Sequence, residues 1–279
     1  MVAGLVVVTG GKGGPGATTL AVGLAAAWAG AGRGVLLVDL DPAGGDVAAH
    51  LPVGQIRGRG VAAVLAAASE RVEPRGVLAE AVEVAPGLRV LVALPRADAA
   101  GLLRPEVGVA VAQAARQADG VDGVDVVIVD AGRLLPGSVA RAVLALPDAV
   151  GVLAARADVP GALATQRALL VAAEATGAEL VVVAVGVRRR TSADVAELAA
   201  ALEHPVSGVV PAWRRQLDRA IRTGQPPTTG RLGRAYQTLA TALWPPDDAE
   251  RSARAAGGRH ARGDGQDAAE RAEREGASP

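Results

Sequence analysis

The sequence GLVVVTGGKGGPGATT, residues 4–19, decides the fold. An uninterrupted apolar run, residues 5–9, leads into a turn made mostly of glycine, and the segment after the turn is rich in Ala and Leu. Strands that are apolar on both faces are typical of a parallel sheet covered by helices. We therefore predict a buried strand over 5–9, a glycine-rich turn and a helix over 18–31.

The same alternation continues along the chain. Further apolar runs predict strands at 35–39, 88–94, 124–130, 149–154, 180–186 and 206–210. Segments with helical spacing lie between most of them, at 103–119, 139–146, 160–176, 192–201 and 214–223. Repetition of strand and helix predicts an α/β fold, with a mostly parallel sheet and helices on both faces.

The composition changes near residue 245. Residues 246–279 are mainly Ala, Gly, Arg, Asp and Glu, with almost no large apolar side chain. Such a segment cannot bury enough surface to offset the entropy lost on ordering. We predict one domain over residues 1–245 and a disordered, charged tail over 246–279.

Composition excludes several classes of site. The 279 residues include 29 basic and 29 acidic side chains, no cysteine and three scattered histidines. With balanced charges the protein has no overall positive electrostatic potential that would attract polyanions such as nucleic acids. The absence of cysteine excludes disulfides and thiolate metal ligands. The N-terminal segment does not read as a secretory signal, and the apolar stretch 20–31 is shorter than the ~20 residues that span a bilayer. We expect a cytoplasmic protein without an integral membrane segment.

The glycine turn fits most of a phosphate-binding pattern, in which Gly, four residues, Gly, Lys and Ser/Thr follow a strand. Gly11, Gly16 and Thr18 match the pattern, and Ala17 stands where the lysine belongs. Glycines let backbone N–H groups converge on a phosphate, and the start of the helix adds partial positive charge. The Thr18 hydroxyl is a ligand for Mg²⁺. In a glycine-rich chain the turn alone has a purely structural alternative.

Lys12, the only lysine of the chain, lies inside this turn. The loop resembles the deviant Walker A loop of the MinD/ParA family of dimerising ATPases, which have the P-loop NTPase fold. The resemblance implies ATP and Mg²⁺ as cofactors and a homodimer with nucleotide at its interface, where Lys12 reaches the phosphates of the partner. The loop residues that the resemblance assigns to nucleotide binding are Gly11, Lys12, Gly13, Gly14, Gly16, Ala17, Thr18 and Thr19.

Three aspartates follow predicted strands and extend the resemblance. It implies that Asp41 orients the attacking water and, with Lys12, is catalytic, whereas Asp39 and Asp130 join Thr18 around Mg²⁺. The carboxyl ends of strands in such sheets meet at one edge, where ligands bind. Each aspartate alone also fits a helix cap or a turn.

Two departures from the family pattern bear on the mechanism. Ala17 removes a cation from the phosphates, so we predict weak or absent hydrolysis, at most a slow ATPase. The chain has no Asn to read adenine, and residues 185–188 lie where that Asn is expected. We assign nucleotide contacts to Arg188 and Pro211.

The loop and the residues after Asp41 and Asp130 look most similar to the CpaE/TadZ branch, which includes septum-site-determining proteins. Our leading hypothesis is a nucleotide-gated switch that positions an unidentified secretion, pilus or division protein and is recruited to the pole or septum by that partner. One alternative is a chromosome-partitioning ATPase that binds DNA nonspecifically through residues 188–190 and 214–215. The other is a nucleotide-free scaffold.

Overall fold

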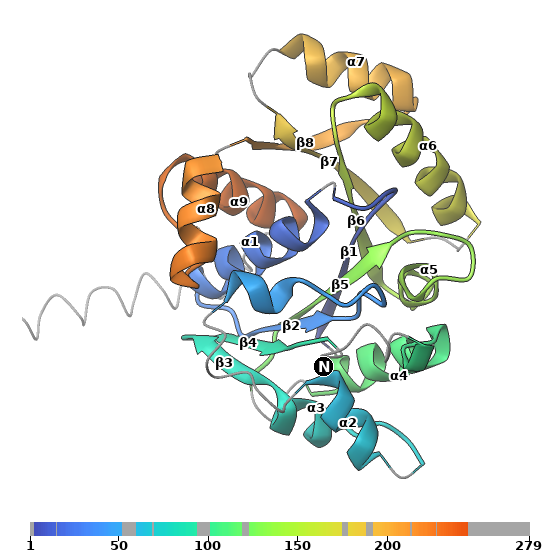
Figure 1. The fold of residues 1–279 in the computed structure, drawn as a ribbon, viewed down its shortest axis with the longest axis vertical. Coiled ribbons are helices and arrows are strands. Elements are labelled where there is room, and N and C mark those ends of the chain that lie inside the picture. The colour runs from blue at the N-terminus through green and yellow to red at the C-terminus, as the bar shows by residue number, and fades with distance from the viewer. Residues whose placement is uncertain are drawn as a thin grey trace, which may run out of the picture. The chain divides into compact units, whose positions relative to one another are not determined.

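The computed structural model describes residues 3–14, 16–51, 60–68, 70–93, 101–118, 123–174, 178–187, 192–212, 214–226 and 228–244 (Figure 1). The chain divides into two units, residues 1–239 and 240–279. The described part of the second unit is the end of the last helix and Trp244. The predicted tail, 246–279, lies outside the described residues and stays a prediction.

The first unit contains a sheet of eight strands in the described residues, in the order β3-β4-β2-β5-β1-β6-β7-β8. All neighbours are parallel except β3 and β4, which are antiparallel. The central strands are buried on both faces because nearly every residue is apolar, as predicted. The strands are β1 (Gly4–Gly10), β2 (Val35–Asp39), β3 (Val82–Ala85), β4 (Leu88–Leu91), β5 (Val126–Arg133), β6 (Ala149–Ala155), β7 (Glu179–Val187) and β8 (Val206–Pro211).

Helices cover both faces of this sheet, which confirms the predicted α/β fold class. Figure 1 shows α1 and α8 on one side and α4, α5 and α6 on the other. The helices are α1 (Ala17–Gly30), the 3-10 helix η1 (Val47–His50), α2 (Val61–Ala67), α3 (Pro74–Glu80), α4 (Pro105–Arg116), α5 (Val139–Leu144), α6 (Val159–Ala173), α7 (Ser192–Leu202), α8 (Arg214–Thr223) and α9 (Gly230–Leu243).

Each predicted strand and helix has a counterpart, but several observed elements were not predicted. These are β3, α2, α3, η1 and α9. The additional strand β3 is short, half-buried and antiparallel to β4. The sheet is therefore mostly parallel, as predicted, with one antiparallel pair. No helix within the described ranges is both long and apolar enough to cross a membrane.

The register of the central strands brings distant residues to one edge. Asp39 at the end of β2 pairs with Asp130 of β5, and Gly10 at the end of β1 pairs with Arg133 of β5. Because these strands are parallel, their carboxyl ends and the loops that follow them meet at the same edge. The glycine-rich turn between β1 and α1 therefore lies beside the aspartates.

Candidate functional site

The turn between β1 and α1 ends in a helix start that is capped by glycine. Gly14 and Gly16 have φ angles of 73° and 93°, in the left-handed region that favours glycine. Gly16 is the N-cap of α1 and provides no side-chain hydrogen bond, and the first turn of the helix has no acidic residue. The first amides of a helix have no partner within it, and they attract anions together with the helix dipole. This helix start is therefore suited to a phosphate group.

The glycines of the turn are required by different constraints. A Cβ atom at Gly11 would collide with the backbone carbonyl of Ala164 in α6, and one at Gly16 would lie 2.9 Å from Cγ1 of Val185 in β7. A Cβ at Gly13 or Gly14 would meet no atom within 4 Å. The turn is thus held tightly at its two ends and is open between them.

Asp39 and Asp130 lie side by side beneath this turn, and neither has any exposed surface. The Asp39 carboxylate accepts hydrogen bonds from the backbone N–H groups of Asp41 and Val47, each at 3.2 Å. The Asp130 carboxylate accepts one long bond of 3.5 Å from the Gly132 N–H through Oδ1. Its other oxygen, Oδ2, has no hydrogen-bond partner within the described residues.

Burial shifts both carboxylates toward the protonated form. Desolvation, and then the charge of Asp130, raises the pKa of Asp39 well above its usual range. Desolvation also raises the pKa of Asp130 to about 6, although the Thr18 side chain partly offsets that rise. A buried carboxylate with a free oxygen beside a hydroxyl needs a proton or a cation as its partner.

The donors present fit a magnesium ion that is shared with phosphate. Mg²⁺ prefers oxygen ligands and is bound through one or two carboxylates, water and substrate phosphates. The free oxygen of Asp130 and the hydroxyl of Thr18 are ligands of this type. No three His, Cys, Asp or Glu side chains of the described segments gather to hold a metal by themselves. The site therefore fits the ion only together with an anionic ligand.

Asp41 is half-buried at the rim of the same edge. Its Oδ1 accepts a hydrogen bond of 2.9 Å from the Ala43 N–H, which holds the carboxylate in a local turn. A Cβ atom at Gly132 would collide with this carboxylate, so Asp41 lies over the backbone two residues beyond Asp130. The structure thus brings the three predicted aspartates together with Thr18.

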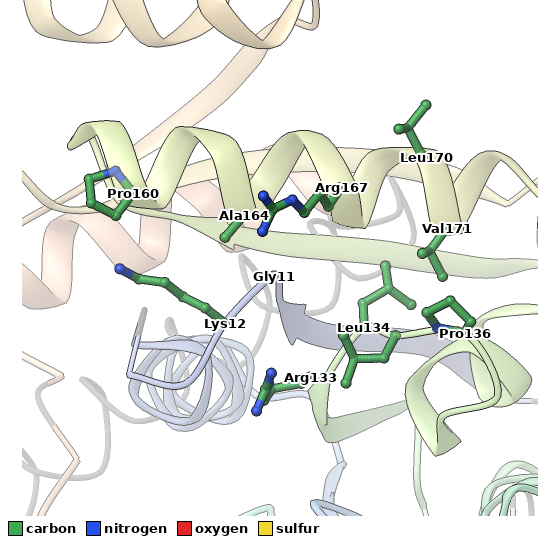
Figure 2. Close-up of a pocket in the computed structure, with 11 residues that line it drawn as sticks. Gly11, Lys12, Arg133, Leu134, Pro136, Pro160, Ala164, Arg167, Leu170 and Val171 are labelled. Atoms are coloured by element: carbon green, nitrogen blue, oxygen red, sulfur yellow. The ribbon is translucent and has the colours of Figure 1, made fainter.

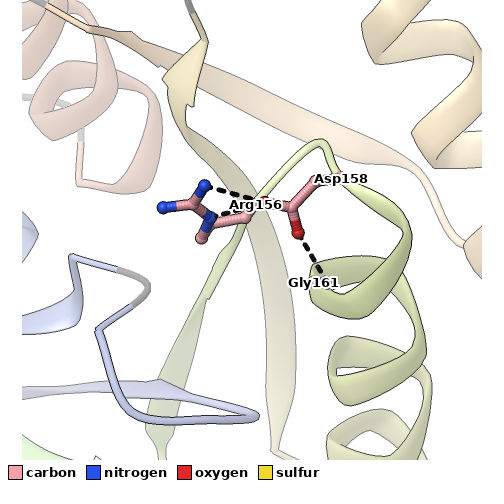
Figure 3. Close-up of polar contacts among 3 residues, drawn as sticks. All are labelled: Arg156, Asp158 and Gly161. Carbon is pink, nitrogen blue, oxygen red and sulfur yellow. Dashed lines mark hydrogen bonds and ion pairs between the residues drawn. The ribbon is translucent and has the colours of Figure 1, made fainter.

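Lys12 is half-buried and points along α6, toward the end that carries Pro160 (Figure 2). Its charge contributes to the lowered pKa of Asp158, whose main cause is a hydrogen bond from Arg156. That ion pair measures 2.7 Å, and Asp158 also caps α6 by accepting the Gly161 N–H at 2.8 Å (Figure 3). The lysine charge therefore acts on an aspartate that already has two partners, Arg156 and the Gly161 N–H.

The remaining predicted residues divide between described and undescribed parts of the chain. Ala17 is the first residue of α1 and is buried, with 8% of its surface exposed. Thr19 is half-buried in the same turn of helix, and Pro211 is the half-buried last residue of β8, paired with Val187. Arg188 lies outside the described residues, as do the other two arginines of 188–190, on which the DNA-binding alternative partly depends.

Sequence reasoning missed residues that support the site rather than form it. The buried Thr9 hydroxyl donates a 2.8 Å hydrogen bond to the Gly132 carbonyl, which ties the end of β1 to that of β5. Val185 in β7 packs against Gly16 of the turn, whereas the sequence analysis considered residues 185–188 only as the expected position of an adenine-reading Asn. Neither residue has a sequence signal, because an apolar or hydroxyl residue at a strand end is common.

A cavity of about 550 Å³ adjoins the turn on the side of α6 (Figure 2). Its lining combines three cations with apolar side chains and includes no acidic residue. The lining residues are Gly11, Lys12, Arg133, Leu134, Leu135, Pro136, Pro160, Ala164, Arg167, Leu170 and Val171. The sequence analysis predicted only the first two as part of a site.

Comparison with known proteins agrees with this fold. Residues 6–227, more than half of the chain, match the family model "CobQ/CobB/MinD/ParA nucleotide binding domain". No curated protein matches the sequence significantly. Solved structures that share the fold include a ParA family ATPase from Chlorobium tepidum TLS, with 19% identity, a TM-score of 0.70, and coverage of 85% of this chain and 98% of that one.

Two further solved structures with this fold contain a nucleotide or a nucleotide analog together with magnesium. The septum site-determining protein MinD from Pyrococcus horikoshii OT3, complexed with Mg-ADP, has 17% identity, a TM-score of 0.69, and coverage of 88% of this chain and 96% of that one. Cobyrinic acid a,c-diamide synthase from Mycobacterium smegmatis, with an ATP analog and magnesium, has 23% identity, a TM-score of 0.65, and coverage of 87% and 94%. The sheet, the glycine turn and the family match lead to one conclusion: this chain belongs to the CobQ/CobB/MinD/ParA family of nucleotide-binding domains.

Proposed function

We propose that the protein is a nucleotide-gated switch that binds Mg·ATP, dimerises around it and positions a partner protein. One observation carries the proposal: a glycine-capped helix start adjoins a buried aspartate, Asp130, whose Oδ2 has no hydrogen-bond partner among the residues that the structure describes. The amides suit the phosphates, and the Asp130 oxygen suits the cation that accompanies them. The ligands in two related structures, Mg-ADP and an ATP analog with magnesium, support the same choice.

Each residue of the site has a proposed task. Thr18 and Asp130 hold the magnesium ion, Asp39 supports its water shell, and Asp41 orients water at the rim. The ion, when bound, supplies positive charge at the phosphate oxygens. The amides after Gly16 bind the phosphate chain of the nucleotide. Val187 and Pro211, at the ends of β7 and β8, lie next to its base.

Hydrolysis is proposed to be slow. Catalysis of phosphoryl transfer depends almost wholly on positioning and on charge stabilisation. Ala17 offers a methyl group where the general pattern has a cation, so a long-lived ATP state is the expected consequence. A switch benefits from such a state because its partner surface then lasts as long as the bound nucleotide.

Dimerisation is proposed to run through Lys12. Its side chain extends along α6, toward the end of that helix that carries Pro160 (Figure 2). An ammonium held at this position is available to the phosphates of a second copy. We further propose that the partner belongs to secretion, pilus or division machinery, on the resemblance of the loop to the CpaE/TadZ branch.

The test combines calorimetry with sedimentation. Titration with ATP should show binding that depends on Mg²⁺, and nucleotide should convert monomer to dimer in the parent protein. Lys12→Ala should keep binding but lose the dimer, whereas Arg75→Ala, which removes an exposed cation on α3, should behave like the parent. Binding that ignores Mg²⁺, or a dimer that forms equally without nucleotide, would overturn the proposal.

A further inference from the structure

Arg133 is the last residue of β5 and lies at the same edge of the sheet as the glycine turn. Two hydrogen bonds fix the backbone on either side of it. The Thr9 hydroxyl donates one of 2.8 Å to the Gly132 carbonyl, and the Leu134 N–H donates one of 3.0 Å to the Gly10 carbonyl. The strand register also pairs Arg133 with Gly10, the last residue before the turn. Residue 133 is therefore held beside the start of the turn.

The side chain of Arg133 is exposed, and within the described residues its guanidinium forms no hydrogen bond or ion pair. In the view of Figure 2 it points from β5 toward α1, and the turn residues Gly11 and Lys12 lie between it and Arg167 of α6. Exposed arginines are ordinary in a chain with 29 basic residues. What distinguishes Arg133 is its fixed position on the β5 side of the turn.

The position of Asp41 indicates which phosphate lies nearest to Arg133. A Cβ atom at Gly132 would collide with the Asp41 carboxylate, so this carboxylate lies against the residue that precedes Arg133. In the proposed function Asp41 orients a water molecule, and in ATP hydrolysis water attacks the terminal phosphate. The Arg133 guanidinium is therefore next to the end of the phosphate chain, beyond the phosphates that the start of α1 binds.

We propose that Arg133 binds the terminal phosphate of ATP and so distinguishes ATP from ADP. A guanidinium is always charged, and its planar fork of N–H donors matches two oxygens of one phosphate group. It also returns, from a different element of the fold, part of the positive charge that Ala17 does not supply. ADP lacks the terminal phosphate and gains no such contact. The inference rests on the proposed function, because it requires a nucleotide whose phosphates lie at the start of α1.

The test is calorimetric titration of the full chain with the magnesium complexes of ADP and of β,γ-imido-ATP, which is not hydrolysed during the measurement. Arg133→Gln should weaken binding of the triphosphate by roughly tenfold or more, the usual effect of losing a hydrogen bond to a charged group, and should leave ADP binding nearly unchanged. Arg133→Lys keeps the charge without the fork, so it should recover part of the loss. The matched control is Arg167→Gln, which removes an exposed arginine of the same cavity from α6 and should bind both nucleotides like the parent.

An equal loss of affinity for both nucleotides in Arg133→Gln, or no loss for either, would overturn the role of Arg133 and leave the proposed function in place. The same selective loss in Arg167→Gln would also overturn it, because the effect would then come from the general charge of the cavity. A parent protein that binds neither nucleotide would overturn the proposed function and this inference together. Urea unfolding without nucleotide should give the same midpoint for Arg133→Gln as for the parent, since the side chain is exposed. A lower midpoint would indicate a structural role instead.

Discussion

At the scale of single residues, position 17 sets the chemistry of the turn. Ala17 begins α1 and is 8% exposed, and it stands where the general phosphate-binding pattern has a lysine. Ala17→Lys should raise the rate of ATP hydrolysis by roughly tenfold or more, since a cation placed on the phosphates typically contributes that much or more to such reactions. Phosphate release under saturating Mg·ATP is the measurement. Ala17→Met, of similar length but without charge, should show no gain; equal rates for both variants would contradict the prediction.

Asp130 presents a conflict between stability and ligand binding. Its carboxylate is fully buried with one oxygen free, and burial raises its pKa to about 6. Asp130→Asn removes the charge at nearly constant shape, so the ligand-free protein should gain about 2 kcal/mol in unfolding free energy at pH 7.5. The same variant should lose the stabilisation that Mg·ATP gives to the parent.

Urea unfolding with and without Mg·ATP measures both effects of Asp130→Asn. Glu197→Gln is the control, because it removes an exposed acid in the middle of α7 and should change neither quantity. A less stable ligand-free Asp130→Asn protein would show that the carboxylate has a stabilising partner that the geometry does not include.

At the scale of elements, the packing of α9 on α1 depends on one glycine. A Cβ atom at Gly23 would collide with the ring of Tyr236, which is 1% exposed. Gly23→Ala should therefore lower the unfolding free energy by about 1–3 kcal/mol, the usual effect of overpacking a core. Gly30→Ala is the control on the same helix, because it meets no atom within 4 Å and gains helix propensity, so it should be neutral or stabilising. Thermal unfolding of both variants checks the prediction.

The hydroxyl of Tyr236 gives a second prediction for the same contact. It is buried and has no hydrogen-bond partner within the described residues, and burial raises its pKa. A buried hydroxyl without a partner costs about 1–3 kcal/mol in lost solvation. Tyr236→Phe keeps the ring and removes this cost, so it should raise the melting temperature, whereas Tyr236→Leu should lower it by leaving a void. A destabilised Tyr236→Phe would indicate a hydrogen bond to an ordered water molecule.

The elements that sequence analysis found and missed differ in their physical signal. Central strands such as β1 and β5 are buried on both faces and appear as continuous apolar runs, so their positions were predicted closely. The edge strand β3 has only four residues, three half-buried and one exposed, which are too few to show a hydrophobic period. By contrast, α9 had a signal, because Leu232, Tyr236 and Leu239 recur at helical spacing and are buried.

The candidate site was predictable only where function requires particular residue types. Gly16, Thr18 and Asp130 stand in a spacing that phosphate and magnesium impose, and the structure brings them to one edge. Arg133 and Arg167 carry no such pattern, since arginine is frequent throughout the chain and their convergence depends on the packing of α6 against the turn. Contacts made by tertiary packing alone leave no trace in local sequence.

At the scale of the whole molecule, the buried aspartates couple stability to pH. The pKa of Asp130 is raised to about 6 and that of Asp39 is also raised, so the folded protein holds these protons more tightly than the unfolded chain does. The contribution of Asp130 is full below about pH 4, the ordinary range of an aspartate, and is lost as pH rises through about 6, and Asp39 contributes in the same direction. The ligand-free protein should thus lose about 2 kcal/mol of unfolding free energy between pH 4.5 and pH 7.5 through Asp130.

A bound cation should remove most of this pH dependence, since it takes the place of the proton. With saturating Mg·ATP the unfolding free energy should stay nearly level between pH 4.5 and pH 7.5, and the gain from ligand should be largest at the higher pH, where Asp130 is ionised. Urea unfolding at three pH values, with and without Mg·ATP, measures both slopes, and Asp130→Asn should flatten the ligand-free slope by itself. A ligand-free protein that becomes more stable from pH 4.5 to pH 7.5 would mean that the carboxylates are paired in the folded state, and the edge of the sheet would then hold no place for a cation.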